Sequence, residues 1–118
     1  MQVPLQLTFR SMAHSDALAT HVQQRVEKLE RLCDRIVSCH VVIELAAHHQ
    51  RRGDHFRVSI NIGLPRHELI ATHEPPDDRG LETAAAATDR AFDEIARQLE
   101  DWVRRQRGGR RAEAGQAS

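Results

Sequence analysis

Eight histidines and two cysteines are the residues of this 118-residue chain whose types could hold a metal ion. Protein zinc sites place such ligands at short, regular spacings, for example HExxH or paired Cys and His residues. No such spacing occurs, and His48, His49 and His55 fall in or beside a predicted turn. Cys33 and Cys39 fit neither a metal knuckle nor a CxxC redox pair. We expect no metal and no cofactor, and two buried free thiols.

Catalytic motifs are also missing from the sequence. It contains no Gly-rich phosphate loop, no nucleophile elbow and no carboxylate pair at a spacing that suggests acid/base chemistry. The polar positions of the alternating segment 55–64 carry no aromatic rings on which RNA bases could stack. We therefore expect a protein that is not an enzyme. If it binds RNA, its helices and their charges must do so.

Charges are sorted in the stretch RVEKLERLCDR, residues 25–35. At roughly 100° per residue on a helix, four cations fall on one flank: Arg25, Lys28, Arg31 and Arg35. Three acids gather about a third of a turn away: Glu27, Glu30 and Asp34. A cationic flank that is exposed beside a neighbouring helix could meet nucleic-acid phosphates. A solvated helix face explains the same sorting equally well.

A second row of cations, Arg90, Arg97 and Arg104, recurs every seven residues in the C-terminal part of the chain. Asp93 precedes Arg97 by four residues and Glu100 precedes Arg104 by four. Such spacings are typical of ordinary helix-stabilising ion pairs. This row is therefore either a phosphate-binding line or a set of pairs within one helix.

The net charge of zero hides a separation of charge along the chain. Residues 1–103 hold 12 basic and 16 acidic residues, a net charge of −4, whereas residues 104–118 hold five arginines and one glutamate, a net charge of +4. This asymmetry suggests a polyanionic partner that the basic segment reaches. A purely solubilising tail is the alternative.

Apolar periodicity predicts six elements. Alternation with period two predicts strands and recurrence at three- and four-residue steps predicts helices. Ser15 is the expected N-cap of the first helix, and Gly108 with Gly109 the expected end of the second. In order, we expect a strand over 3–9, a helix from Ser15 to about Cys33, strands over 36–45, 55–64 and 67–73 with a turn-forming connection over 47–54, a stop at 75–80, and a helix from Leu81 to about Gln106.

The order β-α-β-β-β-α predicts an α+β fold in which two helices pack on one face of a four-stranded mixed sheet. The strand-helix-strand start predicts a right-handed crossover with the first two strands parallel. We expect one domain over residues 1–105 and a flexible basic tail over 106–118. No apolar run is long enough for a membrane span and no signal peptide is visible, so we expect a cytoplasmic protein.

Three segments, in their order and spacing, resemble a known family: SDALATHVQQRVEKLERLCDRIVSCHVVIEL, FRVSINIGLPRHELIA and IARQLEDW. Over residues 3 to about 104 the chain is similar to the ribosome hibernation promoting factors and ribosome-associated inhibitor A, also called sigma-54 modulation proteins or protein Y. The resemblance implies a fold like that of double-stranded-RNA-binding domains. It also implies binding to the small ribosomal subunit and its rRNA in the channel for mRNA and tRNA, which inhibits translation under stress or in stationary phase.

Matching positions carry the family's phosphate-binding role to Arg25, Lys28, Arg31 and Arg97. With the two helical rows, the predicted rRNA-binding residues are Arg25, Lys28, Arg31, Arg35, Arg90, Arg97 and Arg104. The length implies a short-type member without the extra C-terminal domain of long members.

Two positions depart from the family pattern. Glu94 stands where a lysine is frequent, and Ala85 where an aromatic residue is usual. These departures and the acidic body favour an alternative function: a diverged protein-binding module on the same fold that no longer binds ribosomes. Weak self-association is a further expectation.

Overall fold

The computed structural model describes residues 3–49, 53–74 and 83–117. Six elements follow one another in the order that the sequence predicts. They are β1 (Leu5–Arg10), α1 (Asp16–Leu32), β2 (Ser38–His49), β3 (Gly53–Leu64), β4 (His67–His73) and α2 (Ala84–Ala117).

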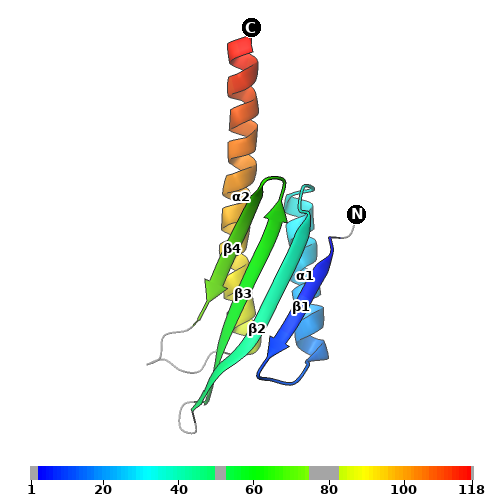
Figure 1. Ribbon diagram of the computed structural model, residues 1–118, viewed down its shortest axis with the longest axis vertical. Coiled ribbons are helices and arrows are strands. Elements are labelled where there is room, and N and C mark those ends of the chain that lie inside the picture. Colours follow the sequence, from blue (N-terminus) through cyan, green and yellow to red (C-terminus); the bar gives the residue numbers. More distant parts are fainter. Residues whose placement is uncertain (1–2, 50–52, 75–82, 118) are drawn as a thin grey trace.

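The four strands form one sheet in the order β1-β2-β3-β4. β1 is parallel to β2, as the crossover rule predicts, whereas the other two pairings are antiparallel. Both helices cover the same face of this sheet, behind it in the view of Figure 1, and α2 contacts β3, β4 and α1. The predicted α+β fold is therefore confirmed.

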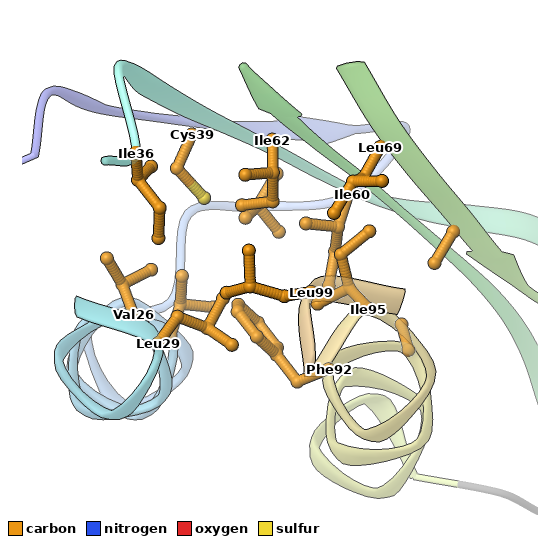
Figure 2. Close-up of a cluster of buried hydrophobic side chains, with 14 of the residues drawn as sticks. Val26, Leu29, Ile36, Cys39, Ile60, Ile62, Leu69, Phe92, Ile95 and Leu99 are labelled. Atoms are coloured by element: carbon orange, nitrogen blue, oxygen red, sulfur yellow. The ribbon is translucent and has the colours of Figure 1, made fainter. Parts of the chain in front are cut away.

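The core lies between the sheet and the two helices (Figure 2). The predicted alternation in β3 is confirmed, because Val58, Ile60 and Ile62 are fully buried and Phe56 packs against them. From the helices, the side chains that fill this layer are Val22, Val26, Leu29, Phe92, Ile95 and Leu99. Each of these large apolar side chains contributes about 1.5 to 3 kcal/mol through burial.

Helix caps fix where α1 and α2 begin. The hydroxyl oxygen of Ser15 accepts a hydrogen bond from the Leu18 amide at 3.2 Å, which confirms the predicted N-cap. At the start of α2, the Thr83 hydroxyl accepts from the Ala86 amide at 3.0 Å. This helix begins at Ala84 rather than at the predicted Leu81, which lies outside the described residues together with the predicted stop at 75–80.

The structure differs from the sequence prediction at the far end of α2, which continues through Gly108 and Gly109 to Ala117. A helix interior tolerates glycine at a cost of about 1 kcal/mol relative to alanine. The glycines are flanked by Arg107 and by residues 110–114, which are mostly good helix formers. The helix therefore does not have to end at them. Whether residues 106–118 form a flexible tail stays a prediction.

Two smaller predictions were also wrong. β2 and β3 extend into the predicted connection over 47–54, with His49 opposite Gly53 and an irregularity in the register between Leu45 and Ala47. Ala85, placed on the apolar stripe of α2, is exposed, whereas Ala87 and Ala91 are buried. The buried side of α2 thus lies slightly further around the helix than the sequence pattern suggests.

The two cysteines are free and buried, as predicted. Burial, with a smaller contribution from the nearby Glu30 carboxylate, raises the pKa of Cys39 to about 12. This thiol therefore stays protonated at neutral pH.

The lower end of the sheet, as drawn in Figure 1, carries a polar cluster around Arg57. Its guanidinium donates to Glu74 at 2.9 Å and to Glu44 at 3.0 Å. The hydrogen bond from Arg57 lowers the pKa of the Glu74 carboxyl, and the buried His55 contacts the same carboxyl at 3.0 Å. The only cluster with a strongly held arginine at this end is thus internally neutralised among the described residues.

Candidate nucleic-acid interface

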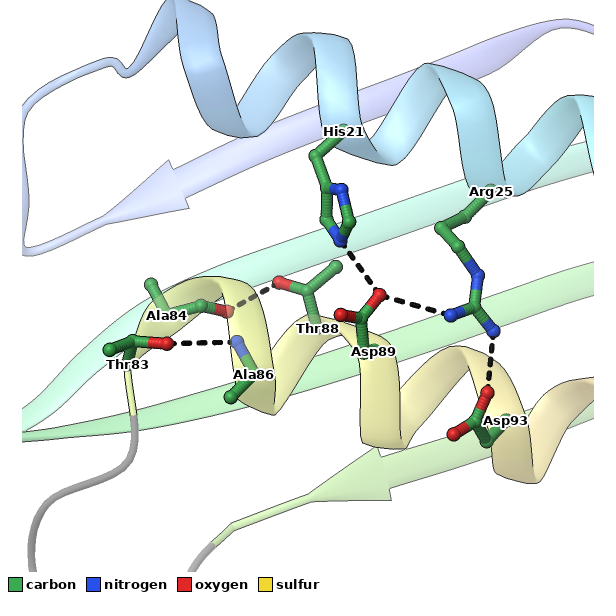
Figure 3. A network of polar contacts seen from close by, with 8 residues as sticks. All are labelled: His21, Arg25, Thr83, Ala84, Ala86, Thr88, Asp89 and Asp93. Carbon is green, nitrogen blue, oxygen red and sulfur yellow. Dashed lines mark hydrogen bonds and ion pairs between the residues drawn. The ribbon is translucent and has the colours of Figure 1, made fainter.

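The basic flank of α1 divides into parts with different surroundings. Arg25 points across to α2, where its guanidinium contacts Asp89 at 3.0 Å and Asp93 at 2.7 Å (Figure 3). The same guanidinium lies 5.5 Å from the centre of the Phe92 ring. Only 18% of the Arg25 side chain is exposed. A phosphate could reach Arg25 only by competing with two carboxylates.

His21 joins this arrangement one turn earlier on α1. Its ring nitrogen Nε2 lies 2.7 Å from Asp89, on the carboxyl oxygen that also contacts Arg25 (Figure 3). Two side chains of α1 and two of α2 thus form an interhelical ion-pair cluster: His21, Arg25, Asp89 and Asp93. This cluster ties the two helices together and neutralises the part of the basic flank nearest their N-terminal ends.

Lys28 and Arg31 are exposed and have no ion pair within the part of the chain that the structure describes. Arg31 follows the buried Leu29 by two residues, which is about 200° around a helix, so it lies on the side of α1 away from the sheet. These two cations are accessible to a phosphate without breaking any interaction. They are the predicted site residues that the structure leaves open on α1.

Arg35 follows α1 and lies over the Trp102 ring of α2, 5.4 Å from its centre. A hollow of about 380 Å³ opens here between the C-terminal part of α1 and α2. Its cationic lining comes from Arg31, Arg35 and Arg107, and two acids, Glu30 and Asp34, also contribute. The structure therefore adds Arg107, which we did not include in the predicted site. Only the packing of α2 beside α1 brings Arg107 to Arg31.

The predicted row on α2 makes ion pairs, but not those that the spacing suggested. Arg97 pairs with Glu94 and Arg104 pairs with Asp101 at 3.2 Å, each three residues earlier. Asp93, the expected partner of Arg97, is held by Arg25 instead. The guanidinium-bearing side chains of Arg97 and Arg104 are nevertheless 76% exposed. Arg90 is exposed too and also has an interaction partner.

The described residues were also searched for other kinds of site. They contain no group of three or more His, Cys, Asp or Glu side chains that could hold a metal ion. None of the helices within the described ranges is both long and apolar enough to cross a membrane.

The fold and this surface define a class: small α+β proteins in which two helices on one face of a single sheet expose cations toward solvent. The particular family follows from comparison with known sequences. The model of the family described as Sigma 54 modulation protein / S30EA ribosomal protein matches residues 5–107, and the chain belongs to this family. The resemblance stated from the sequence is confirmed, and it places the chain among ribosome-associated proteins.

Solved structures agree with this assignment. The N-terminal domain of Protein Y from Thermus thermophilus is 25% identical, with a TM-score of 0.66 over 86% of this chain and 99% of that chain. A ribosomal subunit interface protein from Coxiella burnetii is 17% identical and shows the same fold, with a TM-score of 0.67 over 85% of this chain and 97% of that chain. No curated protein matches the chain.

Proposed function

We propose that this protein is a translation inhibitor of the hibernation type that binds rRNA of the small ribosomal subunit in the channel for mRNA and tRNA, under stress or in stationary phase. The family and the likeness to Protein Y support ribosome association. The observation that carries the rRNA contact is the exposure of Lys28 and Arg31, which have no ion pair among the described residues. Unpaired, solvated cations bind phosphates without first losing an internal partner.

The remaining cations act at different strengths in this proposal. Arg35, Arg97 and Arg104 are exposed enough to add phosphate contacts, although each already has a partner in the protein. Arg25 contributes least, because Asp89 and Asp93 occupy its guanidinium. The protein binds without chemistry, so inhibition follows from occupying the space that mRNA and tRNA need.

The test compares two double variants that lose the same charge. In K28Q/R31Q the two open cations of α1 are removed, whereas R10Q/R66Q removes two exposed arginines outside the helices. Cosedimentation with small ribosomal subunits across a salt series should show weaker binding for K28Q/R31Q. Its slope of log affinity against log salt should be smaller by about 1.5, because each phosphate contact contributes roughly 0.7 to 0.9. Equal binding by the two variants would refute the assigned residues.

A second candidate function is a protein-binding module on this fold that has lost the ribosome. The observation that favours it is the interhelical ion-pair cluster, which removes a cation from the basic flank in a body whose net charge is −4. Wild-type protein that fails to cosediment with small subunits at low salt would support this alternative and contradict the leading proposal. Addition to a translation reaction gives a second readout, in which only the inhibitor lowers protein synthesis.

A further inference from the structure

A second hollow lies on the opposite flank of α1, beside the start of the edge strand β1. Its volume is about 720 Å³. The floor is apolar and comes from Val3, Pro4, Ile36 and Val37, the last with 58% of its surface exposed. Three acids rim it: Glu27, Glu30 and Asp34. The acidic flank of the stretch 25–35 thus faces the edge strand, just as its basic flank faces α2 and solvent.

The carboxylates of this hollow are open to a partner. Glu27 and Asp34 are exposed and form no ion pair within the described ranges, and Glu30 accepts a hydrogen bond from the Val3 amide at 3.1 Å. Two arginines also line the hollow, but the guanidinium of Arg35 lies over Trp102, toward α2. Arg31 lies on the side of α1 away from the sheet. The potential in this hollow is therefore negative, so it suits a cationic segment.

The molecule itself carries such a segment. Beyond Arg107, α2 continues for ten residues to Ala117, roughly 15 Å at 1.5 Å per residue. Figure 1 shows this extension leaving the rest of the molecule, and no atom lies within 4 Å of the position that a side chain at Gly108 would take. We call residues 104–117 the arginine-rich extension, since it holds all five arginines of the basic segment.

The placement of the two features makes a reciprocal contact possible. In Figure 1 the extension leaves the upper end of the molecule on one side, while the start of β1 and the end of α1 lie at the same end on the other side. A twofold rotation about an axis perpendicular to the view brings the extension of one copy over the hollow of a second copy, and the reverse. Such an isologous arrangement is the commonest form of protein dimer.

We propose that two copies of this chain associate head to head, with the arginine-rich extension of each copy docked in the acidic hollow of the other. The arginine heads pair with Glu27 and Asp34, and their aliphatic stems cover the apolar floor at Val37. Exposed ion pairs contribute modestly and are screened by salt. The dimer is therefore weak, concentration-dependent and sensitive to ionic strength. This inference does not depend on ribosome binding.

The first experiment measures the dimer dissociation constant of the full chain by sedimentation at low salt. E27Q/D34N should weaken association at least about tenfold, because the twofold symmetry removes four carboxylates per dimer. The matched control E68Q/E100Q loses the same charge at two exposed acids outside the hollow, and it should stay within about twofold of wild type. Association should also fall steeply between about 50 and 500 mM salt.

Charge exchange gives the decisive second experiment. A chain with E27R/D34R and a chain with R110E/R111E should each be monomeric alone and should form a heterodimer when mixed. A protein that stays monomeric at every concentration, or a dimer that E27Q/D34N leaves unchanged, would overturn the proposal. An extension that docks within its own chain would give a signal independent of concentration, which would overturn it as well.

Discussion

The two ends of the helix pair treat their cations in opposite ways. Near the N-terminal ends of α1 and α2, Arg25 is surrounded by Asp89, Asp93 and the Phe92 ring, and four-fifths of its side chain is covered. One turn further along α1, Lys28 and Arg31 are exposed and have no ion pair among the described residues. Neighbouring positions of one sequence pattern can thus serve different purposes. The closed end stabilises the helix pair, and the open end is available to a phosphate.

This comparison shows why charge sorting alone does not define a binding surface. A cation on the correct flank of a helix is useful to a ligand only if its own protein has not already paired it. Breaking an existing ion pair must be subtracted from the gain of a phosphate contact. We therefore expect substitutions at the closed end to change stability more than binding, and substitutions at the open end to do the reverse.

The largest effect should come from removing the platform of the closed end. Phe92 is fully buried in the core and its ring lies beneath the Arg25 guanidinium. Phe92→Ala should lower the free energy of unfolding by about 3 to 5 kcal/mol, the usual cost of a large-to-small change in a packed core. Urea denaturation followed by circular dichroism measures this. A loss below about 1 kcal/mol would show that α2 does not pack on the sheet at this residue.

A smaller loss should follow from removing Arg25 itself. Arg25→Gln deletes two ion pairs and a cation-π contact, but Asp89 and Asp93 are 42% and 69% exposed and regain water. The expected loss is about 1 to 2 kcal/mol in the free energy of unfolding. The matched variant Arg31→Gln also removes one arginine from α1 and should leave unfolding almost unchanged. Equal losses would contradict the distinction between the two ends.

Opening the closed end is the converse test. In D89N/D93N the carboxylates that hold Arg25 lose their charge but keep their shape, so the guanidinium becomes available to a phosphate. Binding to small ribosomal subunits at low salt should strengthen several-fold. If Arg25 gains one phosphate contact, the salt slope should steepen by roughly 0.7 to 0.9. The control E68Q/E100Q has the same net charge, and a gain of equal size there would assign the effect to net charge rather than to Arg25.

Much of the fold could be predicted from the sequence because each element carries a local signal. Ser15 marks the start of α1, and the alternation through Val58, Ile60 and Ile62 marks the buried face of β3. The handedness of strand-helix-strand connections then fixes β1 parallel to β2. These signals act over a few residues, so an isolated sequence is sufficient to read them.

The candidate site was only partly predictable, because it depends on contacts between distant residues. The four-residue spacing of Asp93 and Arg97 predicts a pair within α2, yet Arg25, 68 positions away in the sequence, takes Asp93 instead. Arg107 reaches the hollow beside Arg31 only because α2 lies beside α1. Spacing rules compare residues on one element. They cannot say which element will lie next to it.

The smallest expected effect is on the stability of the open end. K28Q/R31Q should change the free energy of unfolding by less than about 0.5 kcal/mol, because both side chains are exposed and break no ion pair among the described residues. Arg31 lies in the last turn of α1, where a cation interacts favourably with the helix dipole, so any small change should be a loss. Urea denaturation of the same protein samples used for cosedimentation checks this directly. A double variant that binds ribosomal subunits poorly and unfolds like wild type would assign the loss to the missing phosphate contacts. If unfolding instead shifts by more than about 1 kcal/mol, Lys28 and Arg31 support the fold, and the contrast between the closed and open ends of the helix pair does not hold.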